Sequence, residues 1–267
     1  MNADVTYLYN SGFLVRIGDL ALVFDDWKDP ANVVQKALAG ADALKASPIG
    51  GGAERSEAEG ARTAVSFYFF ASHNHYDHFD PHIFRYADTG AQCILSRDIW
   101  RSQRTKCEIP AAVLDSDRLH WVHTYDAWAD DRIEVQTFSS TDAGVSFLVT
   151  DKQTGLRVFH AGDFNWWDWE EAEPAQRAVM EQEFRKQLAR MEGLTADLAF
   201  FPVDGRLGAT RAKGAYAFVR TVQVGALVTM HSPGFPRWEV PDGFRPEGQT
   251  FPIWSPLEPG EKQSFSF

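Results

Sequence analysis

The chain has 267 residues, 44% of them hydrophobic, and a formal net charge of −11 at pH 7. This length and composition allow one large globular domain or two small ones, each with a sizeable core. Affinity for nucleic acid depends on clustered Lys and Arg, which this acidic chain lacks, so we expect a small-molecule substrate instead. The sequence does not indicate an oligomeric state.

The amino terminus and the hydropathy of the chain predict a cytoplasmic protein that does not enter a membrane. The opening MNADVTYLYNSGF has no basic start followed by an apolar stretch, and no apolar run approaches the roughly 20 residues of a membrane helix. The two cysteines, Cys93 and Cys107, are too few for a disulfide framework. We interpret them as reduced thiols with no part in the chemistry.

The first part of the chain predicts strands and then a helix. Three short strands are expected over residues 5–9, 13–17 and 21–24. The third runs into Asp25 and Asp26, and residues 31–46 have helical composition. The segment over about 47–62 is rich in Gly, Ser and Glu, which predicts a mobile surface loop.

A cluster of four possible metal ligands follows, in the sequence SFYFFASHNHYDHFD. Residues 65–70 predict a buried strand, and Asp80-Pro81 predicts a helix start, with Asp as N-cap and Pro in the first helical position. The loop between them contains His73, His75, Asp77 and His78. Imidazole and carboxylate groups are ligands that zinc, iron and manganese accept, so this density favours a metal site over an accidental group of surface histidines.

The spacing of the cluster favours two ions over one. His73 and His75 face the same way in an extended chain, whereas the adjacent Asp77 and His78 diverge. Two ions roughly 3.5–4 Å apart could share the four residues if a carboxylate from elsewhere bridged them. Asp163 and His231, both at predicted strand ends, are candidates to complete the site.

The remaining elements suggest where these residues meet. Strands are expected over 132–138, 144–150, 155–160, 197–203 and 225–230, and helices over 170–192 and about 210–222, before a Pro-rich C-terminal segment, 232–267. Five predicted strands end in Asp or His, at Asp25-Asp26, His73, Asp163, Asp204 and His231. Ligand sites in open α/β sheets lie beyond the carboxyl ends of the strands, so these residues are expected along one edge.

The motifs resemble those of the metallo-β-lactamase superfamily. HNHYDH matches its H-x-H-x-D-H motif, and Asp25 or Asp26 resembles its first motif. HAGD, at 160–163, resembles the fourth motif with its bridging aspartate, and MHSPGF, at 230–235, resembles the last. The resemblance covers about residues 5–235. It implies an α+β fold, a four-layer αββα sandwich in a single domain over 1–267, with a dinuclear site at one edge between the sheets.

The resemblance also implies which residues hold each ion. His73, His75 and a third histidine would hold one ion, while Asp77, His78 and His231 would hold the other, with Asp163 between them. The third histidine is absent, because TFSSTDAGVSFLV has Ser139 to Asp142 in its place. We expect Asp142 or water to complete the first site, unequal occupancy, and one or two Zn²⁺ ions, with Mn²⁺ or Fe²⁺ as alternatives.

The implied function is that of a metal-dependent hydrolase that uses metal-activated water on a small ester, lactone, amide or phosphodiester. Asp77 is the expected catalytic residue, because it could hold metal and also orient the attacking water or pass its proton to the leaving group. The missing histidine motivates a second hypothesis, a metal-binding sensor or degenerate member without turnover. A redox di-iron protein is a third.

Several other residues allow two interpretations. Trp166, Trp167 and Trp169 could form a wall for a substrate or pack the 170–192 helix. Asp204 and Arg206 could support the site and contact an anion, or form a surface pair.

The remaining histidines and cations are given no ligand role. His160 is expected to orient neighbouring groups. The others are expected at the surface or on solvated helix faces: His82, His120, His123, Arg211 and Lys213.

Overall fold

The structure, a computed structural model, describes residues 1–45, 65–102, 109–114 and 116–267. The loop expected over about 47–62 and Cys107 lie outside the described residues. In the described ranges, no helix has the length and apolar character needed to cross a membrane. Cys93 is a free, buried thiol.

The described residues form two mixed sheets of seven strands each. The first sheet has the order β14-β1-β2-β3-β4-β5-β6, with β1 (Asn2–Tyr9), β2 (Gly12–Ile17), β3 (Leu20–Phe24), β4 (Ser66–Ala71), β5 (Gln92–Ser96), β6 (Leu119–Val122) and β14 (Lys262–Ser266). The second has the order β13-β12-β11-β10-β9-β8-β7, with β7 (Ala127–Ala129), β8 (Ile133–Ser139), β9 (Val145–Asp151), β10 (Arg157–His160), β11 (Thr195–Pro202), β12 (Gln223–Met230) and β13 (Ile253–Trp254). Every strand expected from the sequence is present, within a few residues of its predicted bounds.

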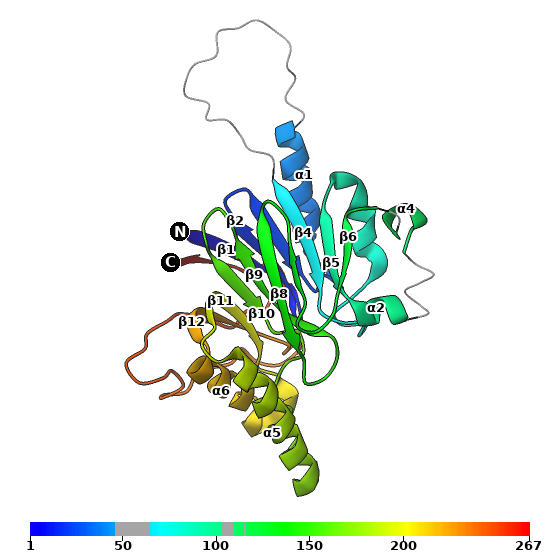
Figure 1. Cartoon of the computed structure of the whole chain (residues 1–267). Coiled ribbons are helices and arrows are strands. Elements are labelled where there is room, and N and C mark those ends of the chain that lie inside the picture. The colour runs from blue at the N-terminus through cyan, green and yellow to red at the C-terminus, as the bar shows by residue number, and fades with distance from the viewer. Residues whose placement is uncertain (46–64, 103–108, 115) are drawn as a thin grey trace, which may run out of the picture.

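Helices flank both sheets (Figure 1). Beside the first sheet lie α1 (Val33–Lys45), η1 (Pro81–Thr89), α2 (Arg97–Arg101) and α4 (Ala111–Leu114). Beside the second lie α5 (Pro174–Leu188), η2 (Ala189–Met191), η3 (Gly205–Thr210) and α6 (Lys213–Thr221). The predicted α+β, four-layer αββα arrangement is therefore confirmed.

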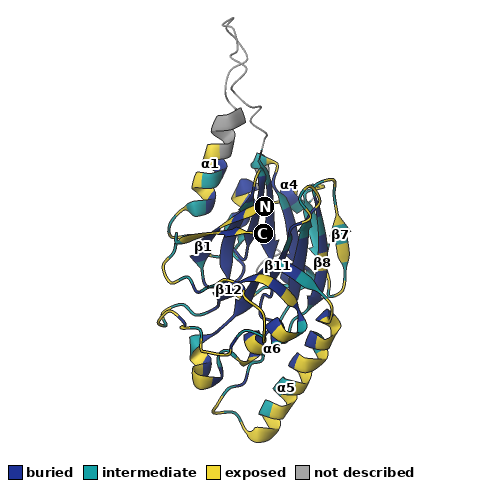
Figure 2. Cartoon of the chain, turned by 90° about the vertical axis from the view of Figure 1, so that its left-hand side faces the viewer, coloured by how far each residue is buried: buried dark blue, intermediate teal, exposed yellow. Residues whose placement is uncertain are grey.

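Aromatic side chains fill the space between the two sheets. The rings of Phe13 in the first sheet and Phe200 in the second are 4.5 Å apart, and those of Phe70 and Phe147 are 5.2 Å apart. Such pairs contribute about 0.5–1.5 kcal/mol each beyond the area that they bury. Figure 2 shows the strands of both sheets as mainly buried, whereas α5 presents many exposed residues to solvent. This packed core makes the sheets a rigid support for the loops at their ends.

Three predicted helices differ from the structure. The helix expected over 170–192 begins only at Pro174, where Glu173 and Gln176 form a capping box, and continues through η2 to Met191. The start at Asp80-Pro81 leads to a 3₁₀-helix, in which Asp80 Oδ1 accepts from the His82 amide at 2.9 Å. The helix expected near 210–222 begins only at Lys213, as α6, and it is preceded by η3, which Gly208 interrupts with a φ of +57°.

The Pro-rich segment 232–267 contributes one strand to each sheet. β13 pairs with β12 in the second sheet, and β14 pairs with β1 in the first. The two termini therefore lie side by side (Figure 1), and the Met1 ammonium donates to the Phe267 carbonyl at 2.7 Å.

Candidate metal centre

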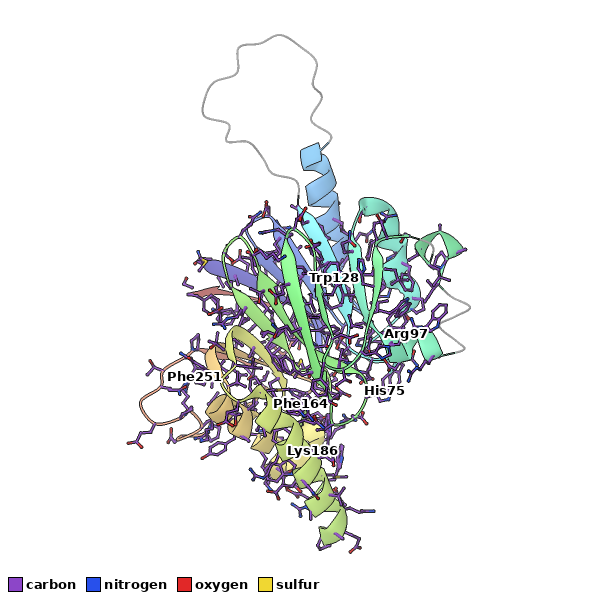
Figure 3. The ribbon with its side chains drawn as sticks, viewed as in Figure 1. His75, Arg97, Trp128, Phe164, Lys186 and Phe251 are labelled. Carbon is purple, nitrogen blue, oxygen red and sulfur yellow. The ribbon has the colours of Figure 1, made fainter. Side chains whose placement is uncertain are left out.

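The structure brings all six expected metal ligands together at one end of the sheets. β3 and β4 are parallel neighbours in the first sheet, as are β10, β11 and β12 in the second, so their carboxyl ends lie at common edges. Figure 3 shows His75 and Phe164 at this end of the molecule, opposite α1. The ligand-type residues form two groups: a first group of His73, His75 and Asp163, and a second group of Asp77, His78 and His231.

Asp163 lies between the two groups and faces both. Its Oδ2 atom is 3.5 Å from Nε2 of His73. Its Oδ1 atom is 3.1 Å from Nε2 of His78 and 3.3 Å from Nε2 of His231. Ligands at 2.0–2.1 Å around a tetrahedral zinc ion are about 3.3–3.4 Å from one another. These separations therefore fit two ions that share one carboxylate.

Unpaired buried atoms point to a cation in the second group. Among the described residues, His78 Nε2, His231 Nε2 and Asp163 Oδ1 have no hydrogen-bond partner. Leaving a polar atom buried and unpaired costs about 1–3 kcal/mol. Three acceptor atoms that converge in this way repel one another unless a positive charge lies between them. The nitrogen and oxygen donors suit Zn²⁺, Mn²⁺ or Fe²⁺.

Asp25 orients His78 toward this point. Its Oδ2 lies 2.7 Å from His78 Nδ1, and it also accepts from the amide and hydroxyl of Ser72 at 2.7 and 2.8 Å. Burial disfavours the His78 imidazolium, but Asp163 and Asp25 outweigh it and raise the His78 pKa well above its usual value. In the absence of metal, a proton would thus occupy the place of the cation.

Asp26, the alternative to Asp25 in the sequence, faces away from the centre. Its Oδ2 lies 3.2 Å from Nε2 of His82, whose Nδ1 lies 3.0 Å from Asp80. The prediction that His82 is a surface histidine is therefore wrong: its side chain is 20% exposed and is held by two carboxylates.

Asp204 orients His231 in the same way. His231 Nδ1 donates to Asp204 Oδ2 at 2.9 Å, which leaves Nε2 free to face the centre. Asp204 is buried and is held by Arg206, whose Nε and Nη2 donate to it at 2.9 and 2.5 Å. Burial would raise the pKa of Asp204, but the bonds from His231 and Arg206 lower it. Of the two interpretations of this pair, the supporting role fits the structure.

Asn10 positions the second group, which the sequence did not reveal. Its Nδ2 lies 3.2 Å from both Oδ2 and the carbonyl of Asp77, and its own carbonyl accepts from the His231 amide at 3.1 Å. Asn10 lies in the turn between β1 and β2 with a φ of +55°, a conformation that Asn tolerates better than most residues. The only sequence signal was the turn-like YNSG.

The first group has a carboxylate near the position of the missing histidine. His73 Nε2 and His75 Nδ1 are 2.9 Å apart, and burial lowers the pKa of His73 to about 3, so that its imidazole is neutral at pH 7. Asp142 Oδ2 lies 3.6 Å from His75 Nδ1, and both side chains are half exposed. The nearby Thr141 hydroxyl instead bonds both the amide and the carbonyl of Asn165.

The three tryptophans divide between their two interpretations. Trp167 borders the centre, because its ring lies 5.6 Å from that of His231 and its Nε1 donates to the Asp163 carbonyl at 3.1 Å. Trp169 stacks on Trp167. Trp166 stacks on Phe184 of α5 and thus packs the helix.

The remaining cations and histidines lie outside both groups. Lys213 is an exposed helix residue, as expected, and its ammonium also pairs with the buried Asp168. His160 orients neighbours as expected, since it donates to the Ser11 carbonyl at 2.9 Å and accepts from the Gly162 amide. His123 is exposed, but His120 is half-buried against Gln92 rather than at the surface.

Comparison with known proteins identifies the fold. No family model matches the chain, and no curated protein matches it in sequence. Igni18, a metallo hydrolase from the archaeon Ignicoccus hospitalis, aligns over 100% of both chains with a TM-score of 0.57 and 15% identity. YhfI from Bacillus subtilis, a metallo-β-lactamase fold protein, aligns over 99% of both chains with a TM-score of 0.57 and 14% identity.

A β-hydroxylase, whose activity differs from that of the metallo hydrolase Igni18, also resembles this chain in fold. A variant of the β-hydroxylase CmlA from Streptomyces venezuelae aligns over 99% of this chain and 54% of its own, with a TM-score of 0.53 and 12% identity. At such identities the likeness concerns the fold alone. Together with the two facing sheets and their outer helices, these alignments establish that the chain has the metallo-β-lactamase fold.

Proposed function

We propose that this protein is a metal-dependent hydrolase that binds one or two Zn²⁺ ions, with Mn²⁺ or Fe²⁺ as alternatives, and cleaves a small ester, lactone, amide or phosphodiester. The observation that carries the proposal is the position of Asp163, with one carboxylate oxygen toward each ligand group. When bound, such ions supply a water activated near neutral pH and polarise the scissile carbonyl or phosphoryl oxygen. The likeness to Igni18, described as a metallo hydrolase, supports this class of reaction.

Asp77 is the residue that we assign to proton transfer. Its side chain is 25% exposed, whereas those of His78, Asp163 and His231 are at most 6% exposed, so it lies where substrate and solvent can reach the centre. Asn10 holds its Oδ2 at 3.2 Å. From this position Asp77 can orient the attacking water and pass a proton to the leaving group.

The second candidate is a metal-binding protein without hydrolytic turnover. It is favoured by the first group, which has the half-exposed Asp142 near His75 in place of a buried histidine. The fold does not decide between these functions, since CmlA is a β-hydroxylase on the same architecture.

Metal analysis and a substrate panel test the proposal. The purified protein is analysed for metal and assayed with chromogenic esters, lactones, amides and phosphodiesters, beside Asp77→Asn and the exposed control Asp242→Asn. We expect turnover of at least one class, a loss of at least about 100-fold in kcat/KM for Asp77→Asn, and native activity for Asp242→Asn. Metal-loaded protein that hydrolyses none of the panel would reject the hydrolase and favour the binding protein.

A further inference from the structure

A small cavity opens beside the second ligand group. It has a volume of about 250 Å³, and Asp77 and His231 lie in its wall. Aromatic side chains form another part of the wall, among them Tyr9, Trp27 and Tyr76. Its volume is below the roughly 300–1,000 Å³ of pockets for drug-sized ligands, so it suits a small molecule with an apolar body.

Arg206 is the only Lys or Arg among the described residues that line this cavity. Its Nε and Nη2 donate to Asp204, and its guanidinium lies 5.6 Å from the centre of the Trp169 ring. Nη1 donates no hydrogen bond to any residue that the structure describes, and the side chain is 52% exposed. One edge of the guanidinium is therefore fixed while another remains open. A cation held in this way loses little side-chain freedom when it binds a ligand.

The negative charge around the cavity means that an anionic ligand would depend on this open edge of the Arg206 guanidinium. The chain has a net charge of −11, and Asp77 and Asp204 lie in the same wall, so a negative group held away from the metal ions would be repelled without a cation of its own. Lys28 adds a second positive charge nearby, since its Nζ lies 4.8 Å from the centre of the Tyr9 ring and 5.6 Å from that of Trp27. An aromatic wall with a fixed guanidinium is suited to a ligand that has both an apolar part and a negative group.

We propose that Arg206 binds a carboxylate or phosphate group of the substrate, at a distance from the bond that is cleaved. The substrate class is then a small ester, lactone or amide with an apolar body and a remote anionic group. The inference rests on the proposed function, which assigns proton transfer at the cleaved bond to Asp77.

Three 4-nitrophenyl esters of similar length test the inference: the neutral pentanoate, the hemiglutarate with a terminal carboxylate, and the 4-phosphonobutanoate with a terminal phosphonate. Each variant is first loaded with Zn²⁺ to the native stoichiometry. In Arg206→Gln we expect KM to rise about 10- to 100-fold for an anionic ester, the loss expected for a hydrogen bond between charged groups. KM for the pentanoate reports any effect of the weakened hold on Asp204, and it should rise at least about tenfold less than KM for the anionic ester. The anionic ester that responds more strongly identifies the preferred group.

Two further variants separate contact from positioning. Arg206→Lys keeps the charge and should recover part of the affinity for the anionic ester. Arg211→Gln removes a charge five residues away and should behave as native protein toward all three esters. Equal losses for the neutral and anionic esters in Arg206→Gln would show that Arg206 acts only by holding Asp204, and would overturn the inference.

A binding measurement covers the case in which the protein hydrolyses none of these esters. Isothermal titration calorimetry compares glutaric acid monoanilide with neutral pentananilide, neither of which has an activated leaving group. If native protein binds only the monoanilide more tightly than Arg206→Gln does, the anion site is retained although the hydrolase proposal has failed. If neither anilide distinguishes the two proteins, the anion site is rejected as well.

Discussion

His78 donates its Nδ1 proton to Asp25 across 2.7 Å, and both side chains are completely buried. The orientation of His78 is thereby fixed, so that Nε2, 3.1 Å from Asp163 Oδ1, is the nitrogen that would face an ion. The Ser72 amide and hydroxyl hold Asp25 in turn. The ligand geometry of the second group therefore depends on β3 and β4, the strands before Asp25 and Ser72.

Asp25→Asn should weaken metal binding without removing a ligand. An amide cannot accept the three hydrogen bonds of the Asp25 carboxylate as strongly, so His78 loses its fixed orientation, and we expect a loss of about 10- to 100-fold in affinity. Competition with a chromophoric chelator measures it. Asp26→Asn is the matched control, because Asp26 is equally buried but faces His82. Native affinity in Asp25→Asn would contradict this assignment.

Asp77→Ala should greatly reduce activity and leave the metal-free fold intact. The side chain lies in a loop and is partly exposed, so its removal leaves no core cavity, and we expect the free energy of unfolding in chelator to change by less than about 0.5 kcal/mol. kcat/KM should fall about 10²- to 10⁴-fold, the range for loss of an acid–base group. Urea unfolding and steady-state kinetics measure the two quantities. Substantial residual activity would show that another group transfers the proton.

Gly144→Ala should destabilise the fold strongly. Gly144 has a φ of +66°, and a Cβ atom there would lie 1.9 Å from the Ser72 carbonyl oxygen and 2.5 Å from His73 Cβ. Left-handed strain of about 1–2 kcal/mol and overpacking of about 1–3 kcal/mol should together lower the free energy of unfolding by about 2–5 kcal/mol. Gly155→Ala is the control, because its φ is +75° but no atom lies within 4 Å of the added Cβ. Equal losses in the two variants would mean that the close approach to His73 costs nothing.

The sequence predicted which residues lie together at the candidate metal centre, because the pattern behind this prediction, a strand followed directly by Asp or His, is local. Strand ends can be recognised from a few residues, and parallel pairing of β10, β11 and β12 then places Asp163, Asp204 and His231 at one edge. The capping residues of α5 were also present in the sequence, as Glu173, Pro174 and Gln176, but the helical composition of the residues before them concealed the true start.

Other features depend on contacts between distant segments. Asp25 and Asp26 are equivalent in sequence, and only the fold shows that Asp25, with a φ of +44°, faces His78. Asn10 is 67 residues from Asp77, so no local pattern could connect them. The pairing of β14 with β1 likewise joins the two ends of the chain. Such pairings are decided by the burial of whole sheet faces, which single segments do not encode.

Asp168→Asn should lower stability in a manner that depends on pH. Hydrogen bonds from Arg177 and Lys213 lower the pKa of Asp168 to about 2, although burial opposes this. A lowered pKa stabilises the fold above the unfolded-state pKa of about 3.9, and this contribution is lost as the pH falls through about 2. We expect a deficit of about 1–2 kcal/mol at neutral pH, allowing for screening of the half-exposed cations.

Urea unfolding at about pH 7, 5 and 3 measures this deficit, which should be equal at the first two values and smaller at the third. Asp242→Asn, at an exposed carboxylate, is the control and should show no such trend. A deficit of the same size at all three pH values would mean that Asp168 acts through packing and not through its charge.

The two ligand groups should differ in metal affinity. The second has three protein ligands and one oxygen of Asp163, whereas the first has two histidines and the other oxygen. Each missing ligand weakens a site, so the first ion should leave well before the second on titration with chelator. Asp142, with Oδ2 3.6 Å from His75 Nδ1, is the described carboxylate placed to compensate.

Substitution of Asp142 tests this asymmetry directly. Asp142→Ala should make the first ion leave at still lower chelator concentration and leave the second unchanged, because His231 and Asp77 lie in the other group.

Asp142→His would supply the imidazole that the superfamily pattern has nearby, and should raise the metal content toward two. The same change at Thr141 would remove the hydroxyl that bonds Asn165, and is therefore expected to disturb the Asp163 loop instead. Two equally tight ions in the native protein, unaffected by Asp142→Ala, would show that some other ligand completes the first group.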